Sequence, residues 1–252
     1  MRTSTILAAS FLAITALIFS VEANYDYSAE TRSGNYEGDL VLNQRQLDTA
    51  KSGRNPVVTP EEKWINNLVP YVVEENYFSP ENIRLIREAM NRIEEVSFIQ
   101  FRPRKSEQIY LVVSGEPTGC WSTLGRHRGP NRMNLSPAEC MREGSVVHQL
   151  LHVLGFGHET NSVDRDFFMD IVYQNIEPSL GVNLRKYDGF QFPDFGISMD
   201  MDSILHFGWN HFSLDGSQTI YTKERNATLG QRESLSLKDI RKLNMMYKCS
   251  WC

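Results

Sequence analysis

The chain has 252 residues, enough for one sizeable domain with processed segments or for two small domains; a single core is the simpler interpretation. Its formal net charge of −5 leaves no basic surplus, so the composition gives no support to nucleic-acid binding. The sequence shows neither internal repeats nor low-complexity tracts that would indicate a repeat architecture.

Residues 1–23 have the features of a secretory signal peptide. An apolar run over residues 6–19 follows Arg2, and Val21-Glu22-Ala23 places small residues two apart, as a signal peptidase requires. The run is too short to span a bilayer comfortably, and no stop-transfer flank follows it, which disfavours an N-terminal anchor. We therefore predict a secreted, extracellular protein with no membrane partner.

Secretion permits glycosylation and disulfide formation. Asn134-Leu135-Ser136 and Asn226-Ala227-Thr228 are sequons, although Pro137 makes the first a weaker acceptor. In an oxidising compartment the cysteines are candidates for disulfides rather than free thiols. The four are Cys120, Cys140, Cys249 and Cys252.

The next segments alternate between polar and globular character. Residues 24–53 are polar and carry few core-forming side chains, which indicates an extended arm. From Pro56 the composition becomes globular, and the β-branched and aromatic run that ends residues 64–77 predicts a strand. Ser79-Pro80-Glu81 then opens a helix, because serine caps it and proline fits its first position. Its apolar face, which we assign to core packing, is Ile83, Ile86, Met90, Ile93 and Val96.

The rest of the chain mixes short strands and helices. The pattern predicts a buried strand over 109–115, loop and strand over 119–136, and a helix over 145–154. Residues 164–176 indicate irregular structure leading into a short strand, and 237–247 have helical spacing. This alternation is too irregular for a doubly wound parallel sheet, so we predict an α+β fold.

Three histidines have the spacing of a zinc site. His148 and His152 lie four residues apart, so a helix presents both imidazoles on one face. Gly155 allows the chain to leave the helix and turn back, so that His158 can complete a three-histidine site. Ordinary structural histidines are the alternative, but half of the chain's six histidines fall in these eleven residues. We predict one zinc ion per chain.

The pattern HxxxHxxGxxH followed by Glu159 resembles the astacin family of secreted zinc metalloendopeptidases, within the metzincin group. Further segments similar to the family extend along nearly the whole chain. The resemblance implies a two-subdomain domain with the active-site helix between a twisted mixed sheet and an irregular C-terminal subdomain. It also implies protein or peptide substrates. The further segments are VPYVV, GCWSTLGR, DRDFF, YQNIEPS, SILHF and LGQRESLSLKDIRKLNMMYKC.

The polar arm is similar to the family's pro-segment. In NYEGDL, Asp39 matches the aspartate that occupies the open position of the zinc and keeps the zymogen latent. The resemblance implies a pro-segment over 24–54, an activating protease that cleaves near Arg54, and a metallopeptidase domain over 55–252. Glu159 is then expected to meet the new amino terminus.

The sequence departs from the family at three positions of the site. Gln149 replaces the glutamate that acts as general base; an amide accepts a hydrogen bond but has no useful basicity. Phe207 replaces a tyrosine whose hydroxyl stabilises the oxyanion in the family. Leu205 replaces the methionine of the family's Met-turn, a volume-conserving change that should cost little.

The cysteines depart as well. The resemblance implies a Cys120–Cys140 disulfide, but Phe98 stands where Cys249 has its usual partner. Cys249 is therefore left to pair with Cys252 in a tiny loop, to remain free, or to bond another chain.

Three hypotheses follow for the activity. The chain is a zinc-binding protein with little or no peptidase activity that binds peptides or proteins, a weakly active protease, or a structural protein that does not use its metal. The intact ligands argue against the third. Gln149 and Phe207 favour the first over the second, whereas Asp39 argues for the second, because an inert protein needs no latency.

Overall fold

The structure is a computed structural model that describes residues 28–31, 33–54, 56, 58–187, 194–224, 227 and 229–248. The predicted signal peptide, the glycosylation site Asn226, and both Cys249 and Cys252 lie outside the described residues.

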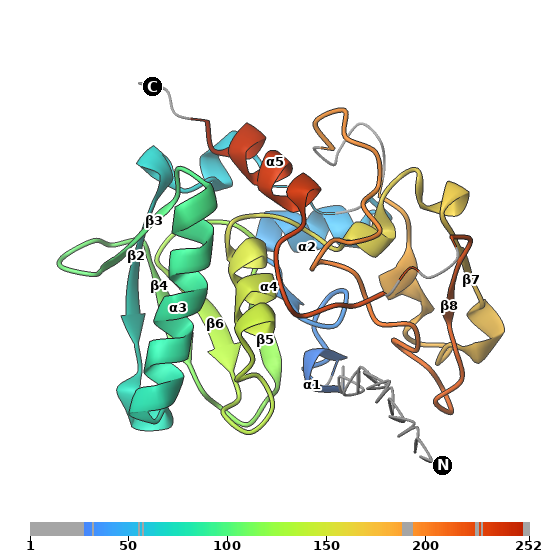
Figure 1. Cartoon of the computed structure of the whole chain (residues 1–252), viewed down its shortest axis with the longest axis horizontal. Helices are drawn as coiled ribbons and strands as arrows, with labels where there is room; N and C mark the ends of the chain where they lie inside the picture. Colours follow the sequence, from blue (N-terminus) through green and yellow to red (C-terminus); the bar gives the residue numbers. More distant parts are fainter. Residues whose placement is uncertain are drawn as a thin grey trace, which may run out of the picture.

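The described chain folds into a larger sheet with helices and a smaller, mostly irregular part (Figure 1). The helices are α1 (Ser28–Thr31), α2 (Gln44–Lys51), α3 (Pro80–Val96), α4 (Glu143–Val153) and α5 (Leu237–Met246). The strands are β1 (Leu40–Val41), β2 (Leu68–Val73), β3 (Gln100–Pro103), β4 (Tyr110–Ser114), β5 (Cys120–Thr123), β6 (Pro130–Leu135), β7 (Met169–Ile171) and β8 (Ile220–Thr222).

The six-stranded sheet has the order β1-β5-β6-β4-β2-β3. Its neighbours pair in parallel except for β5 and β6, which are antiparallel, so the sheet is mixed and the α+β class is confirmed. We predicted loop and strand over 119–136; both β5 and β6 are strands, because the turn after Gly125 returns the chain beside itself.

Helices α3 and α4 lie side by side on one face of this sheet (Figure 1). The side chain of Ser79 accepts a hydrogen bond from the backbone N–H of Asn82 and so caps α3, as its sequence predicts. Ile86, Met90 and Ile93 are buried, which confirms the apolar face. This core packs against α4, a helix buried along nearly its whole length.

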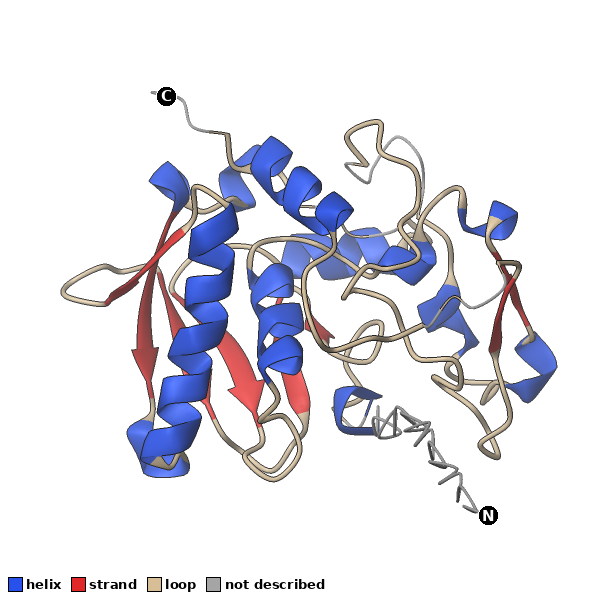
Figure 2. Cartoon of the chain, viewed as in Figure 1, coloured by secondary structure: helices blue, strands red, loops and turns tan. Residues whose placement is uncertain are grey.

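The chain between α4 and α5 is mostly loop with short 3-10 turns, as Figure 2 shows. Its regular structure is the antiparallel pair β7-β8, which lies at the far end of the molecule from α3. A separate apolar cluster that includes Met169 and Ile220 fills this part. Helix α5 returns to the first core, where the Tyr247 hydroxyl donates to the carbonyl of Leu154 (2.7 Å).

The arm before residue 55 is more ordered than its composition indicates. Instead of an extended segment, it contains α1, β1 and α2. Leu40 and Leu42 are buried against Leu124, and β1 pairs in parallel with β5 at the end of the sheet. The short helix α2 begins with a capping box between Asn43 and Gln46. The buried leucines, the strand pairing and the cap therefore help to order a polar segment on the surface of the domain.

Among the described residues, we find no helix that is both long and apolar enough to cross a bilayer.

The close contact between Gly144 at the start of α4 and the backbone of Arg232 can be tested by substitution. A Cβ atom built on Gly144 would lie 1.9 Å from the carbonyl oxygen of Arg232, a backbone atom that cannot move aside cheaply. Gly144→Ala should therefore lower the free energy of unfolding by about 2 kcal/mol or more, as measured by urea denaturation. Gly181→Ala is the control, because the nearest atom to its Cβ position is 3.9 Å away. Equal effects of the two substitutions would contradict this packing.

Candidate metal centre

Helix α4 and the turn after it bring the three predicted ligands together. His148 and His152 lie one turn apart on α4, and their Nε2 atoms are 2.9 Å apart. Gly155 ends the helix with a φ of +100°, a conformation that costs glycine little. The chain then turns back and places the ring of His158 4.6 Å from that of His152 between centroids. The sequence prediction of one converging histidine site is confirmed.

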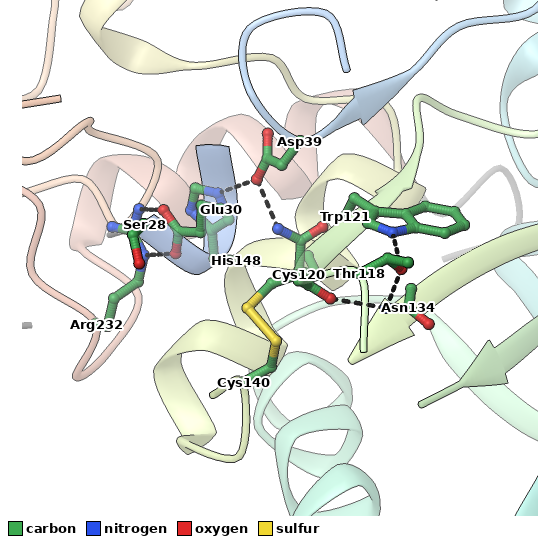
Figure 3. Close-up of a disulfide and its surroundings, with 12 residues drawn as sticks. Ser28, Glu30, Asp39, Thr118, Cys120, Trp121, Asn134, Cys140, His148 and Arg232 are labelled. Carbon is green, nitrogen blue, oxygen red and sulfur yellow. Dashed lines mark hydrogen bonds and ion pairs between the residues drawn. A yellow bond between two sulfur atoms is a disulfide. The ribbon is translucent and has the colours of Figure 1, made fainter. Parts of the chain in front are cut away.

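Asp39 of the arm completes the cluster. One carboxylate oxygen, Oδ2, lies 3.1 Å from Nε2 of His148 and 3.4 Å from Nε2 of His152. The other, Oδ1, lies 3.3 Å from Nε2 of His158. All four side chains are buried, and one ligand atom from each lies within 4.8 Å of the others. Figure 3 shows Asp39 beside His148.

Each imidazole is oriented by an oxygen atom that contacts Nδ1, the ring nitrogen that faces away from the cluster. Nδ1 of His148 lies 2.8 Å from the carbonyl oxygen of Ile204, and Nδ1 of His152 lies 2.7 Å from that of Phe156. Nδ1 of His158 lies 2.9 Å from a carboxylate oxygen of Glu37. Since these oxygens can only accept, each Nδ1 carries the proton and each Nε2 directs its lone pair into the cluster.

This donor set fits a zinc ion. Three neutral imidazoles and a carboxylate are ligands that zinc prefers, and bonds of about 2.0 Å in a tetrahedron separate ligand atoms by roughly 3.3 Å. The four separations given above, from 2.9 to 3.4 Å, lie near that spacing, and all four ligand atoms lie within 4.8 Å of one another. Asp39 Oδ1 is buried without a hydrogen-bond donor, as expected of an atom kept for a metal. A zinc ion held there supplies a Lewis acid that polarises a carbonyl and lowers the pKa of water.

Gln149 lies at the same centre. Its Nε2 donates a hydrogen bond of 2.6 Å to Oδ2 of Asp39, and its side chain is fully buried. Its Oε1 is also buried, without a hydrogen-bond partner among the described residues. The amide thus binds the arm's carboxylate where a second carboxylate would repel it.

Phe207 lies against the third histidine. Its ring centroid is 4.1 Å from that of His158, and on the other side 4.9 Å from that of His211. Phe207 is buried, and the position offers no hydroxyl to the centre. Leu205 is buried in the main core, as expected of an apolar replacement.

Several residues around the centre were not predicted from the sequence. Glu37 accepts hydrogen bonds from His158 and from the hydroxyl of Tyr187 (2.8 Å). The same hydroxyl accepts from the backbone N–H of His158 (2.8 Å). Burial lowers the pKa of His211 to about 3, so this residue is neutral at neutral pH. The only available signal for Glu37 was its place two residues before Asp39.

A second arm carboxylate forms a buried ion pair. Glu30 of α1 accepts two hydrogen bonds from Arg232, at 2.9 Å from Nε and 2.7 Å from NH2 (Figure 3). Burial by itself raises the pKa of a carboxyl, but the Arg232 guanidinium beside it lowers the pKa of Glu30 to about 2. The arm therefore contacts basic groups of the domain through three buried carboxylates, those of Glu30, Glu37 and Asp39.

Glu159, which the resemblance leads us to expect beside the new amino terminus after cleavage, has a partner on α5 in the uncut chain. Both of its carboxylate oxygens lie 2.7 Å from Nζ of Lys242, on α5. The backbone N–H of Asp200 donates to the same carboxylate (2.9 Å). In the full chain the carboxylate of Glu159 therefore already has a cationic partner, Lys242.

The remaining expectations concern the surface and the disulfide. Cys120 and Cys140 form a disulfide with a Cα separation of 5.8 Å (Figure 3). Phe98 is 45% exposed, so it forms no part of the core. Asn134 is fully buried, and its amide donates to carbonyl oxygens of Glu116 and Gly119. This burial leaves no room for a glycan, so the expectation for the first sequon disagrees with the structure.

Comparisons with known proteins agree with this geometry. The model of the astacin peptidase family matches residues 57–248. Seminal metalloprotease 1 of Drosophila melanogaster is 34% identical over 229 residues, covering 87% of this chain and 89% of that protein. Zinc metalloproteinase nas-7 of Caenorhabditis elegans is 34% identical over 214 residues, covering 85% of this chain but only 54% of that protein. Several relatives are thus about twice as long as the part that this chain matches.

A solved structure shows the same fold. High choriolytic enzyme 1, a hatching enzyme zinc-protease from Oryzias latipes, superposes with a TM-score of 0.68 at 32% identity. The match covers 74% of this chain and 93% of that one. The fold and the three-histidine site define a zinc metallopeptidase domain of the metzincin type. The chain belongs to the astacin family.

The metal and its fourth ligand are directly testable. Elemental analysis of protein purified without added metal should give one zinc per chain, and His152→Ala should lose it. Asp39→Ala should speed zinc transfer to a chelator by at least about tenfold, because one of four ligands is removed. Asp48→Ala, an exposed aspartate of α2, should leave the rate unchanged. A folded wild-type protein without zinc would contradict the assignment.

The pKa of Glu30 predicts how acid weakens the fold. Its folded pKa lies below the ordinary value of 4.5, so its contribution is complete above that pH and is lost as the pH falls towards about 2. The shift corresponds to about 3 kcal/mol. Glu30→Gln should lower the free energy of unfolding by about that amount at pH 6, and by much less at pH 3. Urea denaturation at both pH values measures this, and a pH-independent difference would contradict the ion pair.

Proposed function

We propose that this protein is a secreted zinc-binding astacin homologue with impaired or absent peptide-bond hydrolysis, which acts by binding peptides or proteins. The observation that carries the proposal is the placement of carboxylates at the centre. The two that contact the histidines, Asp39 and Glu37, both belong to the arm, and the domain contributes the amide of Gln149. Once the arm leaves, these two carboxylates leave with it.

The cost expected of the two substitutions supports impaired hydrolysis. Hydrolysis needs a group at position 149 that takes a proton from the attacking water and gives it to the leaving amine, and an amide does neither. Losing a general base costs about 10²- to 10⁴-fold. The apolar ring of Phe207 removes an oxyanion donor worth about 10²- to 10³-fold, although such losses need not multiply.

The arm indicates how a peptide would bind. The backbone N–H of Ser122 donates to the carbonyl of Asp39 (2.9 Å), and that of Leu124 donates to the carbonyl of Val41 (3.1 Å). With the arm displaced, β5 becomes an edge strand whose N–H groups are available to an extended peptide. Such strand addition needs no catalytic base, so binding can persist where hydrolysis is lost.

Secretion and processing complete the proposal. The apolar run at residues 6–19 and the disulfide between Cys120 and Cys140 support an extracellular location. Arg54 is exposed after the end of α2, which supports cleavage there by an activating protease. The alternative function is an active metalloendopeptidase of secreted proteins. Its support is Asp39, whose position at the centre is suited to keeping an active site latent.

Restoring the two groups should separate these functions. In arm-free, zinc-loaded protein, Gln149→Glu should raise hydrolysis of a protein substrate by about two to four orders of magnitude. Phe207→Tyr on top of it should add a smaller factor, and alone should do little, because an oxyanion donor is of small use without a base.

The wild type and the variants at Gln149 and Phe207 must be compared at equal zinc content. His152→Ala, which should lose its zinc, is the control for contaminating proteases. Wild-type protein that already cleaves substrates as fast as its active relatives, with less than about a tenfold gain from Gln149→Glu, would overturn the proposal.

A further inference from the structure

We propose that Lys242 is a positioning residue that replaces a freed amino terminus as the partner of Glu159. Cleavage at Arg54 would then open the metal centre without rebuilding the structure around it. The proposal concerns the architecture of the centre and does not depend on whether the protein hydrolyses peptides.

The carboxylate of Glu159 and the ammonium of Lys242 form a buried ion pair. The ammonium lies 2.7 Å from both carboxylate oxygens, and the two residues are 4% and 5% exposed. The backbone N–H of Asp200 donates a further hydrogen bond to the carboxylate of Glu159. A buried carboxylate needs one cation to offset its loss of hydration, and Lys242 supplies that charge. A second ammonium would have to displace the first.

The pair connects α5 to the metal centre. Glu159 directly follows His158, and its backbone N–H donates to the carbonyl of Leu205 (3.0 Å). The neighbouring residue, Ile204, provides the carbonyl that orients His148. Lys242 therefore fixes, through Glu159, the segment that carries one ligand and the turn that orients another.

With Lys242 in place, the space around the pair is too small for a peptide terminus. The cavity there has a volume of about 10 Å³, close to the smallest that holds one water molecule. It is lined by Leu151, Phe156, Gly157, Glu159, Leu205, Asp239 and Lys242.

The chain after the cleavage point passes the end of α4. The side chain of Val58 lies 3.0 Å from the Cβ position of Gly155. Three further residues back to the cleavage point can span about 10 Å. The new terminus thus begins within a few residues of this part of the domain, where the carboxylate of Glu159 already has Lys242 as its partner.

Amine labelling of the chain cut between Arg54 and Asn55 tests the proposal. Near pH 7 an α-amino group reacts far faster than a lysine, because its pKa is about 8 rather than about 10.4. The new α-amino group should react as fast as that of a short peptide of the same sequence. Lys242 should stay at least about tenfold less reactive than the exposed Lys105, before and after the cut. A protected terminus together with a reactive Lys242 would overturn the proposal.

Variants test the positioning role. Lys242→Met leaves Glu159 without its cation, so the cut chain should now protect its α-amino group, and zinc transfer to a chelator should quicken by roughly tenfold. Lys242→Arg should restore the slow zinc transfer. The double variant Glu159→Gln with Lys242→Met removes both charges and should leave the terminus reactive. Zinc transfer unchanged in folded Lys242→Met would refute the positioning role; if that variant does not fold, the wild-type labelling decides.

Discussion

The convergence of three imidazole nitrogens and one carboxylate in the buried interior constrains the rest of this structure. Four ligand atoms within 4.8 Å cannot be brought together without compensation, because each is deprived of hydration. A metal cation is the compensation that suits this donor set. Around it, every Nδ1 of the three histidines has its own acceptor, so the rings cannot rotate away. Helix α4, the turn at Gly155 and the loop before α5 are thus fixed relative to one another.

The arm belongs to this centre as much as the domain does. Glu30, Glu37 and Asp39 are buried, and each contacts a basic group of the domain. Glu30 binds the guanidinium of Arg232, Glu37 contacts Nδ1 of His158, and Asp39 contacts the three histidines of the cluster. Gln149 adds a donor to the same carboxylate that the histidines share. A glutamate at this position would place two carboxylates together unless one were protonated. The amide of Gln149 therefore suits the contact between arm and domain better than a carboxylate would.

Much of the fold and of the site could be predicted from local pattern. The capping of α3, the helix that carries His148 and His152, and the exit at Gly155 depend on neighbours in sequence, so their residues suffice to reveal them. Long-range partners could not be predicted in the same way. No sequence pattern near Glu30 predicts that its partner is Arg232, 202 residues later, and none near Glu159 predicts Lys242. Such pairs form because burial demands a counter-charge, and only the folded chain determines which one is within reach. The arm was mistaken for an extended segment for the same reason, since its order comes from the surface it covers.

The most direct test of the central claim is a crystal structure of the full, uncut chain with anomalous diffraction measured at the zinc edge. We expect one anomalous peak about 2.0 to 2.2 Å from Nε2 of His148, His152 and His158 and from one oxygen of Asp39. We also expect the amide of Gln149 on the same carboxylate. A peak bound by the three histidines with water in the fourth position, and the arm elsewhere, would contradict the claim.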